Sequence, residues 1–217
     1  MTRKQYHNQL RKLKEDTITM GNIAKDNVLG ATISLKDHDP ELAKKVIEAG
    51  SDIDELYAQI EDTCFALLAL QQPMARDLRM IGAILKINID VERIGDIAFE
   101  IAKITIATLE ENHIKPLVDI PRMAEICSEM LASSMEAFEN SDDRLARKIA
   151  KRDNEVDALF DQVRRELITY MIEDPKTIKN ASHLTFVARY LERCGDHITN
   201  ICESIVYMAT GERTDLN

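Results

Sequence analysis

The sequence has few of the residues that make turns, with seven glycines and five prolines in 217 residues. Antiparallel β-sandwiches and barrels need turn residues about every dozen positions, so the composition argues against both fold classes. The sequence also has no uninterrupted apolar run longer than Cys64–Leu70. That run is far too short to span a membrane. What remains is a set of long helices joined by few, short connections.

An excess of basic charge is also missing. Lysine and arginine total 28 against 38 aspartate and glutamate, which gives a net charge of −10, and the halves on either side of His113 each carry −5. Neither half therefore predicts a basic face for DNA or RNA phosphates. The four cysteines form no CxxC pair, and the charged start Met-Thr-Arg-Lys does not resemble a secretory segment. We expect buried, reduced cysteines and a cytoplasmic protein.

A small set of breaks divides the sequence into helix-length segments. The breaks lie at Asp39-Pro40, Gln72-Pro73, Asn112–Pro121, Asn140-Ser141-Asp142 and Asp174-Pro175. They predict six helices, at 2–36, 40–71, 74–111, 119–139, 142–172 and 177–210. Apolar residues in segment 40–71 recur at alternating steps of three and four, which indicates packing against nearly parallel or antiparallel partner helices.

An internal repeat gives the domain organisation. Residues 41–47 and 52–60 resemble residues 144–150 and 155–163 at an offset of 103, and residues 91–97 resemble 191–197 at an offset of 100. Each copy contains three predicted helices. The sequence therefore predicts an all-α fold made of two tandem three-helix bundles, at 1–113 and 114–217, with Asn112–Pro121 as the hinge.

The repeated segments carry paired carboxylates. Glu92 and Asp96 share one helix face nearly opposite the apolar stripe, and Glu192 and Asp196 do the same in the second copy. Four or five carboxylates that converge from two helices repel one another unless a cation lies between them. An all-oxygen ligand set suits Mg²⁺, Mn²⁺, Ca²⁺ or iron better than a structural zinc site. The alternative is an acidic, solvated surface.

Gly95 and Gly195 lie inside predicted helices, where a glycine costs about 1 kcal/mol relative to alanine. A glycine at such a position often marks the close approach of another backbone or of a ligand. We therefore expect a neighbouring element to pack closely against each glycine.

Four segments of the sequence resemble the PhoU family: Gln72-Pro-Met-Ala-Arg-Asp-Leu-Arg, Asp90-Val-Glu-Arg-Ile-Gly-Asp, Tyr190-Leu-Glu-Arg-Cys-Gly-Asp-His and Tyr207-Met-Ala-Thr-Gly-Glu. The resemblance implies two three-helix bundles, often dimeric, with a carboxylate metal site on each. It also implies a regulator that represses the phosphate-starvation response. The implied partners are the ATPase subunit of the phosphate ABC transporter and a sensor histidine kinase.

Carried onto this sequence, the resemblance gives eight candidate metal ligands: Asp54, Glu61, Glu92 and Asp96 in the first repeat, and Asp153, Asp157, Glu192 and Asp196 in the second. The two sets are not copies of each other. Gly50 stands where the second repeat has Asp153, and Arg164 stands where Glu61 would be repeated. The metal, which could be iron, manganese, zinc or magnesium, stays open.

Two other functions compete with this interpretation. A ferritin-like di-iron protein needs two Glu-x-x-His motifs in a four-helix core, and the only match is Glu110-x-x-His113 beside the hinge. His197, next to Asp196, is either an accessory ligand or a surface histidine. No phosphate-binding loop and no nucleophile with a nearby base is found, so no enzyme is predicted. The remaining alternative is a helical scaffold without metal.

Overall fold

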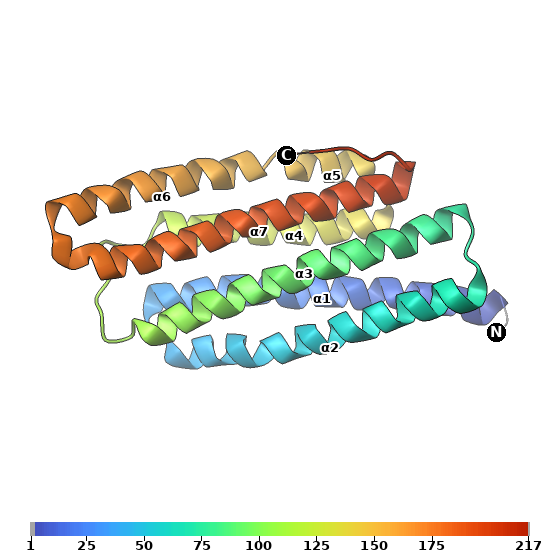
Figure 1. Ribbon diagram of the computed structural model, residues 1–217, viewed down its shortest axis with the longest axis horizontal. Coiled ribbons are helices and arrows are strands. Elements are labelled where there is room, and N and C mark those ends of the chain that lie inside the picture. The colour runs from blue at the N-terminus through green and yellow to red at the C-terminus, as the bar shows by residue number, and fades with distance from the viewer. Residues whose placement is uncertain (1–2, 217) are drawn as a thin grey trace.

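The computed structural model describes residues 3–216 as an elongated array of long helices (Figure 1). The elements are α1 (Arg3–Asp37), α2 (Pro40–Gln71), α3 (Ala75–Ala107), α4 (Asp119–Asn140), α5 (Asp143–Ala150), α6 (Asp153–Glu173), the 3₁₀ turn η1 (Pro175–Thr177) and α7 (Ile178–Thr210). The predicted helix start at residue 2 lies outside the described residues. Within the described residues, none of these helices is long and apolar enough to cross a membrane.

Matching caps begin the second element of each repeat. The Asp39 carboxylate accepts hydrogen bonds at 3.0 Å from the backbone N–H groups of Glu41 and Leu42. Asp142 caps α5 in the same way through residues 144 and 145. Such caps satisfy backbone donors that the first helical turn leaves free. Both predicted helix starts are thereby confirmed.

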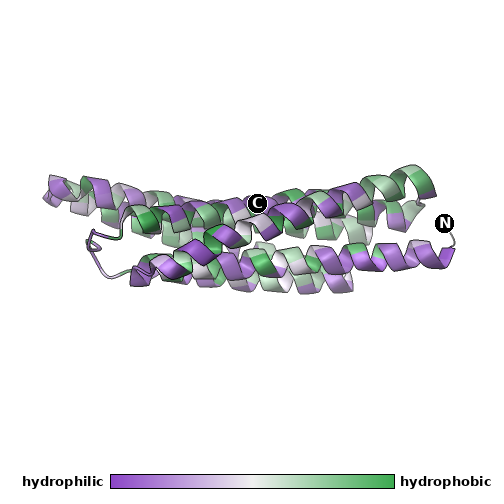
Figure 2. Cartoon of the chain, turned by 90° about the horizontal axis from the view of Figure 1, so that it is seen from below, coloured by the Kyte–Doolittle hydropathy of each residue, from purple (hydrophilic) through white to green (hydrophobic). Residues whose placement is uncertain are grey.

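The two repeats pack along their lengths. Helices α1, α2 and α3 contact one another, α4 to α7 form the second group, and the groups meet through α3–α7 and α1–α4 contacts. Each helix alternates apolar and polar residues along its length (Figure 2). The predicted apolar stripes are buried: Ile84, Ile87, Val91, Ile94, Ala98 and Ile101 on α3, and Leu184, Val187, Leu191, Cys194, Ile198 and Ile201 on α7. The predicted tandem all-α architecture is confirmed.

The connection between the repeats begins earlier than predicted. Helix α3 ends at Ala107 rather than near residue 111, and the Thr108 hydroxyl donates to the Ile104 carbonyl at 2.8 Å. This bond ties the threonine side chain back to the last turn. Residues 108–118 then lead to α4. The predicted domain boundary after residue 113 lies inside this connection and stays a prediction.

The prediction of one continuous helix over 142–172 is wrong. The chain breaks at Lys151 and Arg152, where Arg152 N–H bonds to the Ile149 carbonyl and Glu155 N–H bonds to the Arg152 carbonyl, both at 2.9 Å. These are 3₁₀-type steps, which often mark strain or function inside a helix. Arg152 also binds Glu129 of α4 at 2.7 Å. These contacts override local helix propensity and start α6 at Asp153.

Candidate metal sites

The second repeat brings four carboxylates to one place. Asp153 and Asp157 come from α6, and Glu192 and Asp196 come from α7. Burial, together with the charges of Asp157, Asp196 and Glu192, raises the pKa of Asp153 to about 7. Burial and the Asp196 charge also raise the pKa values of Asp157 and Glu192. This set is hereafter the second cluster, and its members repel one another as long as no cation joins them.

Gly195 makes the second cluster possible. A Cβ atom at Gly195 would lie 2.0 Å from Oδ1 of Asp153 and 3.8 Å from Cβ of Val156. The carboxylate of Asp153 therefore occupies the space that any other residue at 195 would fill. The expectation that this mid-helix glycine marks the close approach of a neighbouring element is confirmed.

Two carboxylate oxygens of the second cluster are buried without a hydrogen-bond partner. They are Oδ1 of Asp153, a residue only 8% exposed, and Oε2 of Glu192. Arg189 contacts the other Glu192 oxygen, Oε1. Buried polar atoms in native proteins nearly always have partners, so each orphan needs an explanation. A hollow of about 190 Å³ is lined by Asp153, Asp157 and Asp196, whereas Glu192 does not line it.

The chemistry of the second cluster fits a hard cation. Carboxylate oxygens are the ligands of Mg²⁺, Mn²⁺ and iron, and the orphaned oxygens of Asp153 and Glu192 leave such positions free. Among residues 3–216, no three acidic, histidine or cysteine side chains already stand at distances that would hold one ion. Binding therefore requires these side chains to turn toward the hollow.

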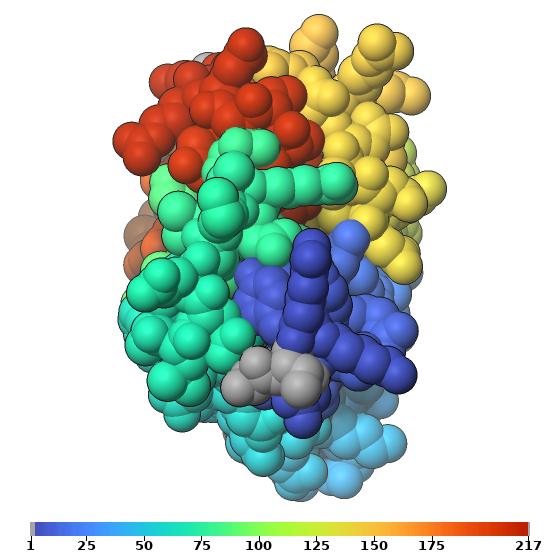
Figure 3. Space-filling model, turned by 90° about the vertical axis from the view of Figure 1, so that its right-hand side faces the viewer, coloured from blue at the N-terminus to red at the C-terminus, as the bar shows by residue number. Residues whose placement is uncertain are grey.

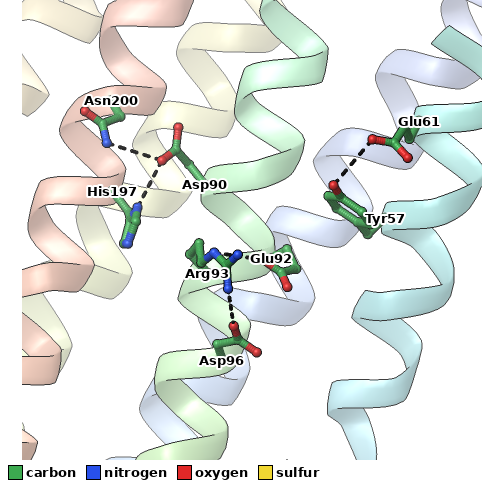
Figure 4. Close-up of polar contacts among 8 residues, drawn as sticks. All are labelled: Tyr57, Glu61, Asp90, Glu92, Arg93, Asp96, His197 and Asn200. Carbon is green, nitrogen blue, oxygen red and sulfur yellow. Dashed lines mark hydrogen bonds and ion pairs between the residues drawn. The ribbon is translucent and has the colours of Figure 1, made fainter. Parts of the chain in front are cut away.

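The first repeat holds a smaller cluster of Asp54, Glu92 and Asp96. These side chains line a hollow of about 210 Å³ together with Gly50 and Gly95. Burial raises the pKa of Glu92, and the charges of Asp96 and Asp54 add to the rise, whereas Arg93 opposes it. Arg93 lies 3.0 Å from Asp96 and 3.4 Å from Glu92 (Figure 4). Arg93 thus contacts two of the three carboxylates of this first cluster and offsets part of their charge.

The remaining first-repeat candidate, Glu61, is not brought to the first cluster. Its carboxylate accepts a hydrogen bond at 3.4 Å from the Tyr57 hydroxyl, apart from the Arg93 contacts (Figure 4). A Cβ at Gly95 would lie 2.8 Å from Cδ1 of Ile53, so this glycine accommodates a buried aliphatic side chain instead of a carboxylate. A Cβ at Gly50 would meet nothing within 4 Å. The first cluster thus lacks a counterpart of Asp153.

One polar contact between the repeats was not found from the sequence. The Asp90 carboxylate on α3 lies 3.0 Å from Nδ1 of His197 and accepts a hydrogen bond at 3.2 Å from Asn200, both on α7 (Figure 4). His197 is thus engaged across the repeat interface. Asp90 is more than 100 positions from both His197 and Asn200 in the chain, so only the tertiary structure reveals these contacts.

The residues of the Glu110-x-x-His113 motif, which a di-iron protein would use as metal ligands, do not lie in a bundle core. A ring nitrogen of His113 lies 2.9 Å from the Leu35 carbonyl, and its ring stacks on that of His38 at 4.1 Å. Glu110 lies in the connection after α3 rather than in a bundle core. The four cysteines are buried and free, as predicted.

Comparisons with known proteins match this architecture. A family model described as the PhoU domain matches residues 17–105 and 120–205. A phosphate-specific transport system accessory protein PhoU homolog of Aquifex aeolicus is 44% identical over 94% of this chain and 92% of its own length. The Escherichia coli accessory protein PhoU is 32% identical, over 96% and 86%.

Solved structures agree with these relatives. The crystal structure of PhoU from Pseudomonas aeruginosa superimposes with a TM-score of 0.92 at 34% identity, covering 95% of this chain and all of the other. The regulatory protein PhoU from Streptococcus pneumoniae gives a TM-score of 0.90 at 31% identity, covering 97% and 99%. Both repeats, and nearly the whole chain, are therefore matched in sequence and in structure, and the chain belongs to the PhoU family.

Proposed function

We propose that this protein is an accessory protein of a phosphate-transport system, which regulates phosphate uptake and represses the phosphate-starvation response by binding rather than by catalysis. The observation that carries the proposal is the similarity, over almost the whole chain, to proteins named as phosphate-specific transport system accessory proteins. The tandem repeat supports a binding role because it offers long helical faces.

The proposed partner is the ATPase subunit of the phosphate ABC transporter, met from the cytoplasm. The net charge of −10 supports docking on a basic surface of that subunit. Contacts between charged surfaces weaken as salt screens them, so binding should fall as ionic strength rises. Contact with a sensor histidine kinase and homodimerisation are further parts of the proposal that rest on the family resemblance.

We also propose that the second cluster holds a divalent or trivalent cation, with Asp153, Asp157, Glu192 and Asp196 as ligands. The orphaned, buried oxygen of Asp153 supports this more directly than acidity alone. The first cluster is the weaker candidate, because it has three carboxylates and Arg93 already contacts two of them. Iron, manganese, zinc and magnesium are the ions to test.

The partner proposal is tested by capture from phosphate-replete cells. The full-length protein, carrying a removable tag, is compared with the Asp96→Ala/Asp196→Ala double variant. The wild type should retain the transporter ATPase, and restored expression should repress phosphate-starvation genes in a deletion strain. Retention of no transporter subunit, together with no repression, would rule out the regulatory role. If the double variant retained the transporter ATPase as well as the wild type does, the two carboxylate clusters would not take part in the contact.

The proposal predicts a gain of cation binding from Gly50→Asp. This change supplies the first cluster with the counterpart of Asp153, and the space around Gly50 is open. An added carboxylate should strengthen cation binding there about tenfold, since ligand charge count tunes affinity over orders of magnitude. Titration calorimetry with Mn²⁺ in an Asp196→Ala background isolates the first cluster. Gly50→Asn is the control without the charge, and equal affinity in both variants would contradict the prediction.

A further inference from the structure

The negative charge of the chain hides a basic region at one end of the molecule. Residues 3–16 and 70–79 contain seven basic and three acidic residues, in a chain whose net charge is −10. The hydroxyl of Tyr6 donates to Oδ2 of Asp77 at 3.1 Å, which ties the start of α1 to the start of α3. Figure 3 shows this end, with the first turns of α1 beside the α2–α3 turn.

Several of the charges at this end are available to a partner. Arg3, Lys4 and Arg76 are exposed, and among the described residues they form no ion pair. Arg11 and Lys12 are also exposed, and their pairs with carboxylates one turn on are long, at 3.8 Å each. Exposed pairs of this kind contribute little and leave the cations free to be attracted elsewhere. The first part of α1 is accordingly hydrophilic in Figure 2.

Large apolar side chains stand beside these cations. Leu70 is 71% exposed at the end of α2, Met74 is 81% exposed in the turn, and Leu78 is 48% exposed in the first turns of α3. We call these three residues, together with Arg3, Lys4, Arg11, Lys12 and Arg76, the basic end. Exposed apolar groups rimmed by charge mark an interaction surface when they gather in one place.

The corresponding turn of the second repeat offers a comparison. Ile172 is 75% exposed and Ile178 is 48% exposed at the α6–α7 turn, so apolar side chains protrude there as well. Around that turn the acidic residues Glu173 and Asp174 are matched by Lys176 and Lys179, so it carries no excess of positive charge. Helix α4 also begins with an acidic residue, Asp119, where α1 begins with basic ones. An excess of cations beside apolar tips therefore belongs to the first repeat.

We propose that the basic end binds the surface of a membrane that contains anionic lipids. Lysine and arginine are attracted to the anionic headgroups, and aliphatic side chains at a turn enter the boundary between headgroups and acyl chains. Both kinds of side chain lie at the basic end, which fits a lipid surface better than a purely ionic partner. The rest of the chain has more acidic than basic residues, so the attraction to anionic headgroups is confined to the basic end.

Flotation with lipid vesicles tests this proposal. The full-length protein is mixed, in the presence of a chelator, with vesicles of phosphatidylcholine alone or with about one third phosphatidylglycerol. The chelator prevents cations from bridging acidic clusters to phosphate groups. The protein should float with the anionic vesicles, fail to float with the neutral ones, and be released as salt rises. Failure of the folded protein to bind anionic vesicles at low salt would overturn the proposal.

Matched variants locate the contact. Arg3→Gln/Lys4→Gln should weaken binding about tenfold or more, and Leu70→Ser/Met74→Ser should do so by a similar factor. Ile172→Ser/Lys176→Gln, at the opposite turn, should bind as the wild type does. Equal weakening in the control would overturn this location. Sedimentation without vesicles that depends on Arg3 and Lys4 would show that the basic end docks on the acidic body of a second copy instead, which would also overturn it.

Discussion

The Asp153→Asn variant is expected to stabilise the metal-free protein while it removes tight cation binding. In the wild type, the Asp153 carboxylate is buried, its Oδ1 has no hydrogen-bond partner, and three other carboxylates surround it. An ionised group in this position costs free energy in the folded state. An asparagine keeps the shape, loses the charge and can donate to the neighbouring carboxylates. We expect a gain of about 2 kcal/mol in unfolding free energy.

The pH dependence of that gain has a definite sign. The pKa of Asp153 is raised from 3.8 to about 7 in the folded protein. The cost of the ionised group is therefore fully present above pH 7 and disappears as pH falls from about 7 toward 4, because the folded state binds a proton that the unfolded state does not. The advantage of the Asp153→Asn variant should be largest at pH 8, reduced at pH 5 and small at pH 4.

Urea unfolding followed by far-UV circular dichroism measures the gain, with chelator present. Asp161→Asn serves as the control, because Asp161 lies on the same helix but is exposed and pairs with Arg164 at 3.1 Å. Calorimetric titration with Mn²⁺ should show affinity reduced roughly a hundredfold in Asp153→Asn and unchanged in the control. A destabilised Asp153→Asn variant, or one that binds Mn²⁺ like the wild type, would contradict the assignment of Asp153 as a ligand.

Most of the fold could be predicted from the sequence because it rests on local signals. Asp39 and Asp142 cap helices through bonds two and three residues away, and the apolar stripes of α3 and α7 follow the helical period. The internal repeat then shows the same caps and apolar stripes a second time. The break at Lys151 and Arg152 was not predicted, and the contact that Arg152 makes there with Glu129 on another helix is visible only in the tertiary structure.

The sequence predicts which residues belong to the candidate sites, but not which of them are buried or what they contact. The repeated Glu-x-x-x-Asp motif places Glu192 and Asp196 on one face, and that follows from helix geometry. Whether a carboxylate is buried depends on packing between helices, which the helical period of one segment does not show. The sequence therefore treats the clusters as near equivalents, whereas Asp153 is buried and orphaned and Glu61 binds Tyr57 instead.

The two mid-helix glycines are expected to respond to alanine in opposite ways. Alanine at 195 would collide with Oδ1 of Asp153 at 2.0 Å, and alanine at 95 would collide with Cδ1 of Ile53 at 2.8 Å. The shorter contact involves the end of a polar side chain beside an open hollow. The longer contact involves a side chain that is only 1% exposed. The ability of the neighbour to move, rather than the distance, decides the cost.

In Gly195→Ala the carboxylate of Asp153 can turn outward into water. The loss of its packing and the strain of turning it are offset by the release of its buried charge and by the higher helix propensity of alanine, worth about 1 kcal/mol. We expect unfolding free energy to change by less than about 1 kcal/mol. Mn²⁺ affinity should fall roughly a hundredfold, because the displaced carboxylate no longer faces Glu192 and Asp196.

In Gly95→Ala the side chain of Ile53 has no free space to enter. Overpacking a core costs about 1–3 kcal/mol, of which the helix propensity of alanine returns about 1 kcal/mol. We therefore expect net destabilisation, with cation binding at the second cluster unchanged. Ile53→Val should relieve the clash and recover stability in the double variant, which separates steric cost from any effect on the first cluster. Equal effects of both alanines on stability and on Mn²⁺ binding would show that the glycines serve one common purpose, contrary to the contacts they make.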